Sequence, residues 1–97
     1  MSSTAVRHQP LAYDVQVTED ELIVSLTDGR RVSAPLVWFP RLLNASPAMR
    51  AEWSFIGDGE GVHWPEADED ISVEALLLGV PSSEYAQLQG GGPPRPS

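Results

Sequence analysis

The sequence contains no cysteine and no lysine, and it has no long apolar run. Without cysteine, disulfide bonds, thiolate catalysis and cysteine-based metal sites are excluded. No apolar segment approaches the roughly 20 residues that a membrane-spanning helix needs, and the first residues do not resemble a signal peptide. We therefore expect a cytoplasmic protein that does not associate with membranes.

Positive charge is scarce, because 6 arginines face 14 acidic residues and the formal net charge is −8. Between Glu52 and Glu74 the chain has eight acidic residues and no basic one. Such a surface repels phosphate backbones, so we expect no nucleic-acid binding by this chain alone. The same surface would attract a basic protein partner, although net negative charge also serves solubility by itself.

Length and composition indicate a single domain, since 97 residues fit one hydrophobic core. We assign residues 1–10 to a flexible N-terminus and residues 11–86 to a single α+β domain. Residues 87–97 hold three consecutive glycines and three prolines, which cannot build a core. We expect this segment to be a disordered tail.

Hydrophobic periodicity predicts a three-stranded antiparallel meander over residues 12–35. Val15 and Val17 alternate with polar neighbours, and the following strand is rich in β-branched residues. Asp28 and Gly29 then separate two extended runs, which is a strong hairpin signal. We expect a type I′ turn there, with positive φ at both residues.

A helical region in two short pieces is expected over residues 40–53. Ser46 is suited to an N-cap and Pro47 to the first helical position that follows it. Four apolar side chains of this region are expected to pack on one face of the sheet: Leu42, Leu43, Met49 and Trp53.

A second hairpin is expected over residues 53–64, with its turn at the glycines of residues 57–61. Residues 71–78 show apolar side chains at helical spacing, with Asp70 or Ser72 as the cap and glycine just beyond. The predicted fold is therefore α+β: a small antiparallel sheet of about five strands in two hairpins, with two short helical regions.

His63 is the strongest candidate for chemistry, because Glu66, Asp68 and Asp70 follow it closely. A histidine with carboxylates can bind a transition metal. Pro65 interrupts the segment, however, and no second histidine is near, so the acids are better explained as complementing a helix dipole. We expect no metal, no cofactor and no catalytic residue; a small metal-binding or enzymatic domain that uses His63 is the alternative.

Aromatic side chains offer a second kind of site. In a small domain they mostly pack in the core, but one or two can anchor a partner. Trp38 and Phe39, beside Arg41, are the favoured anchor. Three acidic residues are the candidate contacts around it: Glu66, Asp68 and Glu69.

Four motifs along the chain resemble, in order, those of the bacterial domain-of-unknown-function family 2442. The resemblance spans about residues 13–79 and is most specific in its last block. The motifs read Asp28-Gly-Arg, Ala34-Pro-Leu, Phe39-Pro-Arg-Leu and Gly61-Val-His-Trp-Pro-Glu-Ala-Asp-Glu-Asp-Ile-Ser-Val-Glu-Ala-Leu-Leu.

This resemblance implies an α+β fold, no established enzymatic activity, and an antitoxin or partner-protein role beside a toxin-like gene. Some relatives carry a C-terminal helix-turn-helix domain, which the 16 residues after Pro81 are too few to form. The leading hypothesis is a small acidic cytoplasmic interaction module, antitoxin-like, that binds a basic protein encoded by the neighbouring gene. A self-associating sheet domain, which forms a homo-oligomer through an edge strand, is a further alternative.

Overall fold

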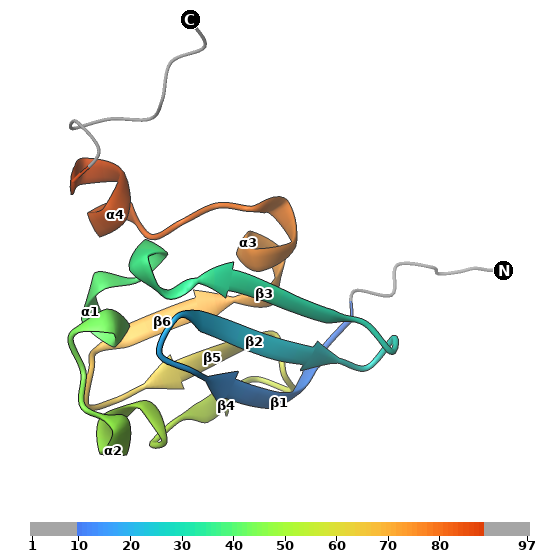
Figure 1. Cartoon of the computed structure of the whole chain (residues 1–97). Coiled ribbons are helices and arrows are strands. Elements are labelled where there is room, and N and C mark those ends of the chain that lie inside the picture. Colours follow the sequence, from blue (N-terminus) through green and yellow to red (C-terminus); the bar gives the residue numbers. More distant parts are fainter. Residues whose placement is uncertain (1–9, 89–97) are drawn as a thin grey trace, which may run out of the picture.

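The computed structural model describes residues 10–88, and the expectations about residues 1–9 and 89–97 lie outside this range. Within it the chain forms six strands, one 3-10 helix and four short α-helices (Figure 1). In chain order these are β1 (Ala12–Val17), β2 (Glu21–Leu26), β3 (Arg31–Pro35), η2 (Leu36–Trp38), α1 (Pro40–Leu43), α2 (Pro47–Arg50), β4 (Ser54–Ile56), β5 (Gly61–Trp64), β6 (Glu69–Ser72), α3 (Val73–Leu78) and α4 (Ser83–Leu88).

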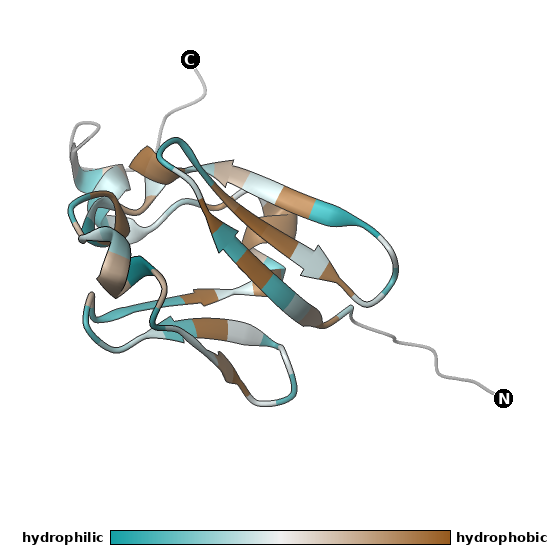
Figure 2. Ribbon diagram, turned by 60° about the horizontal axis from the view of Figure 1, so that its bottom comes forward, coloured by the Kyte–Doolittle hydropathy of each residue, from teal (hydrophilic) through white to brown (hydrophobic). Residues whose placement is uncertain are grey.

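The strands form two antiparallel sheets of three, in the orders β1-β2-β3 and β4-β5-β6. Figures 1 and 2 show the two sheets as separate layers, one facing the other. The α+β class is confirmed, but the expected single sheet of about five strands is wrong. Each sheet has one apolar face, and stacking the two faces removes both from water.

The core lies between the sheets. Leu22, Val24 and Leu26 point inward from β2, and Val62 and Trp64 point inward from β5. Along β2 buried positions alternate with partly buried or exposed ones, and because Ile23 is also apolar, Figure 2 shows this strand as a mostly hydrophobic run. The Trp64 indole N–H donates to the Arg50 carbonyl oxygen at 3.1 Å, so the largest buried side chain has its polar atom satisfied.

The first three strands confirm the predicted meander, but the turn between β2 and β3 is not of type I′. Gly29 has φ +94°, whereas Asp28 is not among the residues with positive φ. Leu26 accepts a hydrogen bond from the Gly29 N–H at 3.0 Å and donates its own N–H to Arg30 at 2.8 Å. The loop therefore has three residues, a type I turn followed by a glycine bulge, and one positive φ is enough.

The helical region forms in two pieces as predicted. The Ser46 hydroxyl accepts a hydrogen bond from the Met49 N–H at 3.2 Å and caps α2. Leu42 is buried, and Met49 and Trp53 pack against the core. Leu43 departs from the expectation, because its side chain is 37% exposed.

The segment expected as one helix over residues 71–78 is divided between β6 and α3. Glu69 and Ile71 are buried and their neighbours are exposed, which is the two-residue alternation of a strand. Ser72, and not Asp70, caps α3: its hydroxyl accepts from the Ala75 N–H at 3.0 Å. Gly79 ends α3 with φ +75°, as predicted.

The last helix, α4, departs from the prediction, because it includes residues 87 and 88, which the sequence pattern places in the tail. Ser82 fixes its start: the hydroxyl donates to the Trp38 carbonyl oxygen at 2.7 Å and accepts from the Tyr85 N–H at 3.2 Å. This double contact ties α4 to η2. Within residues 10–88 no helix has the length and apolar character to cross a membrane.

Candidate functional site

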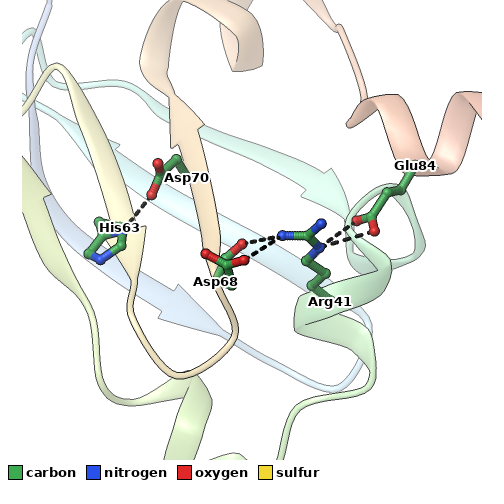
Figure 3. A network of polar contacts seen from close by, with 5 residues as sticks. All are labelled: Arg41, His63, Asp68, Asp70 and Glu84. Carbon is green, nitrogen blue, oxygen red and sulfur yellow. Dashed lines mark hydrogen bonds and ion pairs between the residues drawn. The ribbon is translucent and has the colours of Figure 1, made fainter.

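Arg41 joins three parts of the chain at one side of the molecule (Figure 3). Its Nη1 donates to the backbone oxygen of Asp68 at 2.6 Å and lies 3.1 Å from the Asp68 carboxylate. Its Nε lies 3.0 Å from the carboxylate of Glu84 in α4. The hydrogen bond to Glu84, with the charges of Glu84 and Asp68, raises the pKa of Arg41, so the guanidinium stays charged.

Asp68 occupies an unusual backbone conformation in the turn between β5 and β6. Its φ is +56°, and within residues 10–88 no other non-glycine residue has a positive φ. Aspartate tolerates this region better than most residues. Arg41 holds both the backbone oxygen and the carboxylate of Asp68, so the ion pair fixes the turn that leads into β6.

The six predicted contact residues do not all reach the surface. Arg41, Glu66 and Asp68 are exposed, and Trp38 is half-buried. Phe39 is only 2% exposed and packs edge-on against Trp38, with ring centroids 6.5 Å apart. The expectation that Phe39 contributes contact surface is therefore corrected: Phe39 lies in the core and packs against the Trp38 ring.

Glu69 is the second correction, because it belongs to the inward-facing row of β6 and is only 8% exposed. Within residues 10–88 no hydrogen bond or ion pair reaches its carboxylate. Burial raises the pKa of the Glu69 carboxyl, and the charge of Glu84 raises it further, while Arg41 partly offsets both. A buried acid without a partner is costly, and such groups gather at functional sites.

A groove of about 300 Å³ lies beside β6, and Glu69 lines it. We call it the β6 groove. Strand residues Glu69–Ser72 form one side, and the segment from Val80 to Ser82 forms the other. The apolar residues that line it come from four separate segments, and they include Phe39, Ile71, Ala75, Val80 and Pro81.

His63 and Asp70 lie next to each other on the outer face of the second sheet (Figure 3). The His63 Nδ1 is 2.5 Å from an Asp70 carboxylate oxygen, and Ser54 pairs with His63 on the opposite strand. This order of serine, histidine and aspartate resembles a hydrolytic triad. Within the described residues, however, no hydrogen bond joins Ser54 to His63.

Between residues 10 and 88, no three histidine or acidic side chains come together in a way that could hold a metal ion. The carboxylates that follow His63 in the sequence lie in different surroundings: Asp70 contacts the imidazole, Asp68 contacts Arg41, and Glu69 faces inward.

Negative charge dominates the surface around the second sheet. Of the eight acidic side chains between Glu52 and Glu74, all but Glu69 are exposed. Within the described residues, ion pairs reach only Asp68, through Arg41, and Asp70, through His63. The other exposed carboxylates of this stretch present their charge to solvent.

The β6 groove is the feature that sequence reasoning missed. Its walls combine residues about 40 positions apart, and no local pattern joins Phe39 to the segment after Gly79. One signal was present: Glu69 and Ile71 occupy alternate positions, which is typical of a strand and would have turned the glutamate inward.

Comparison with known proteins finds a matching family and a similar solved structure. The model of a family described as "Protein of unknown function (DUF2442)" matches residues 12–82. A crystal structure of a protein of unknown function from Rhodospirillum rubrum ATCC 11170 is similar, with a TM-score of 0.67 and 26% sequence identity. The similarity covers 77% of this chain and 93% of the other. No curated protein matches the chain.

Proposed function

The chain belongs to DUF2442, a family of proteins of unknown function, and from that premise we propose that it is a small interaction module that binds a basic protein partner. The observation that carries this proposal is the acidic surface: seven of the eight acids between Glu52 and Glu74 are exposed, no arginine or lysine lies among them in the sequence, and within the described residues only Asp68 pairs with an arginine. Such a surface accelerates encounter with a positively charged partner.

The proposal extends to an antitoxin-like role in the cytoplasm, in which the partner is the toxin-like product of a neighbouring gene. Charge alone tunes the encounter more than the affinity, so an apolar anchor is also needed. We assign the anchor to Trp38, which is half-buried at the end of η2 and rests on buried Phe39. The protein itself performs no catalysis in this proposal.

The test is surface plasmon resonance against the product of the adjacent gene at several salt concentrations. Reversing two exposed acids, by Asp58→Lys with Glu66→Lys, should slow association by about 10-fold at low salt and flatten its salt dependence. The matched control is Asp14→Lys with Glu19→Lys, which reverses two exposed acids of the first sheet and its turn.

Trp38→Ala should mainly speed dissociation, because it removes contact area and leaves the charges in place. The backbone oxygen that holds Ser82 is kept in this variant. An association rate that is indifferent to ionic strength, or equal losses in the two double reversals, would contradict the proposal.

The contact between His63 and Asp70 favours a second candidate, a small hydrolytic or metal-binding domain. A fluorophosphonate probe would label Ser54 if the row of Ser54, His63 and Asp70 activated it. Metal analysis of protein purified without chelator would detect an ion that His63→Ala releases. Labelling or stoichiometric metal that is lost in His63→Ala would favour this candidate over the interaction module.

A further inference from the structure

β6 is an edge strand, and half of its backbone groups face the β6 groove. Val73 donates its N–H to the Glu60 carbonyl oxygen at 2.9 Å, which sets the phase of the ladder between β5 and β6. In an antiparallel ladder every second pair exchanges hydrogen bonds. The pairs of Ile71 and Glu69 are therefore the bonded ones, and the N–H groups of Asp70 and Ser72 point away from β5.

Within residues 10–88 no other backbone group forms a hydrogen bond with the outward-pointing N–H and C=O of Asp70 or with the N–H of Ser72. The groove beside them is lined by Asp70 and Ser72 on one side and by Pro81 and Ser82 on the other. An edge strand with free hydrogen-bonding groups beside an apolar groove is the arrangement in which a sheet accepts an extended peptide.

Glu69 gives the groove a chemical preference. As a residue Glu69 is only 8% exposed, it lines the groove, and its carboxylate has no hydrogen-bond or ion-pair partner within the described residues. Arg41 makes no hydrogen bond to it; the Nε and Nη1 of Arg41 contact Glu84 and Asp68 instead. A buried carboxylate in this state is complementary to a cationic group that brings its own hydrogen-bond donors.

We propose that the β6 groove binds an extended segment of the partner, which pairs its backbone with the outer edge of β6 and places an arginine or lysine side chain against Glu69. The inference rests on the proposed function, since it names the segment of the basic partner that is recognised. Directly opposed residues of neighbouring strands share a face of the sheet, so a cation opposite Glu69 enters on the inward side.

Charge complementarity selects this occupant over an apolar one. Exposed Asp70 and buried Glu69 both line the groove, and the exposed acids between Glu52 and Glu74 add further negative charge to this part of the molecule. An apolar strand would leave the Glu69 carboxylate buried and unpaired. An extended segment with a cationic side chain pairs with the Glu69 carboxylate and also forms hydrogen bonds with the outward backbone groups of β6.

The test uses a peptide probe, acetyl-Thr-Val-Arg-Val-Thr-amide, titrated into ¹⁵N-labelled protein. The amide resonances of Asp70 and Ser72 should shift, because their N–H groups gain acceptors. Replacing the arginine by citrulline keeps the shape and removes the charge, and should weaken binding by about 10-fold or more. N-methylation of alternate residues blocks backbone pairing and should abolish the shifts.

Two matched variants locate the cation. Glu69→Gln should weaken the arginine peptide by about 10-fold and remove the preference over citrulline. Glu66→Gln deletes the same charge from an exposed position three residues away and should change the affinity less than twofold. Equal binding by wild-type protein and Glu69→Gln, no binding at millimolar peptide, or shifts confined to the turn at Glu66 would each overturn the inference.

The remaining outcomes separate this inference from the proposed function. If the protein sediments alone as a dimer that the peptide does not dissociate, a second copy occupies the edge and the inference falls. If the peptide fails while the adjacent gene product binds with steep salt dependence, the inference fails and the proposed function stands. If the peptide binds as described and the gene product does not, the groove is supported and the proposed partner is wrong.

Discussion

The carbonyl oxygen of Gly59 accepts a hydrogen bond from the Ala12 N–H at 2.8 Å and joins the two sheets at one corner. A side chain at Gly59 would have no room, since its Cβ would lie 2.4 Å from the Ala12 carbonyl oxygen. The glycine also has φ +114°, a conformation that other residues adopt only with strain. The contact between the layers therefore depends on the absence of a side chain.

Gly59→Ala should lower the free energy of unfolding by more than about 2 kcal/mol, because it adds a backbone clash to the strain of positive φ. Gly29→Ala is the matched control: its φ is +94°, but no atom lies within 4 Å of the added Cβ. It should cost about 1 kcal/mol, from strain alone. Urea midpoints measure both, and equal losses would mean that the contact with Ala12 is relaxed at no cost.

Ser72→Ala should cost about 1 kcal/mol, because the hydroxyl that caps α3 is lost. Asp70→Ala should cost less than about 0.5 kcal/mol, since Asp70 makes only an exposed contact with His63. Thermal denaturation of the two variants compares them directly. If Asp70→Ala lowered the stability more than Ser72→Ala, Asp70 and not Ser72 would be the cap of α3.

The sequence predicted those features that depend on neighbouring residues. The meander over residues 12–35 and the Ser46 cap follow from short patterns, and the structure has them. The division of the segment at Ser72 was not predicted, because residues 71–78 contain a helical stripe that masks the two-residue alternation before it. Pairing with β5 decides the outcome, and that partner is not part of the local sequence.

The candidate site was harder to predict for the same reason. Glu69 stands in a run of acids that looks uniformly exposed, and only the strand alternation turns its side chain inward. The opposite wall, from Val80 to Ser82, is placed by the hydrogen bonds between Ser82 and Trp38, which are 44 residues apart. Contacts over such distances have no signal in a local pattern.

Arg41→Ala should loosen α4 and leave the global stability nearly unchanged. The contacts of Arg41 with Asp68 and Glu84 are exposed, so water and salt screen them and they add little to the global stability. Hydrogen exchange at the amides of α4 should become faster, because the helix loses its ion pair with α1. Arg31→Ala is the control, since within the described residues Arg31 is exposed on β3 without an ion pair. If the amides of α4 exchange equally fast in both variants, the ion pair of Arg41 does not hold α4 in place, and the hydrogen bonds of Ser82 alone do so.

Glu69→Gln should stabilise the free protein at neutral pH. Burial, together with the charges of Glu84, Asp70 and Asp68, raises the pKa of the Glu69 carboxyl above 4.5, and Arg41 is the cation that opposes this. For an acid whose pKa is raised by folding, the stabilising contribution is fully present below the unfolded-state pKa. It is lost as the pH rises through the raised folded-state pKa, so the ionised carboxylate is a cost at pH 7.

Urea midpoints between pH 4 and pH 8 test this sign. The midpoint of Glu69→Gln should exceed that of wild-type protein at pH 7, and the difference should shrink as the pH falls through the raised folded-state pKa and vanish below the ordinary value of 4.5. Glu66→Gln, an exposed acid of the same turn, should follow wild-type protein throughout. If Glu69→Gln were less stable than wild-type protein at pH 7, the carboxylate would already have a stabilising partner in the free protein. The inference that it is unpaired in the β6 groove would then be wrong. If Glu69→Gln raises the free energy of unfolding and also weakens binding of the arginine peptide, the buried charge serves binding and destabilises the folded state.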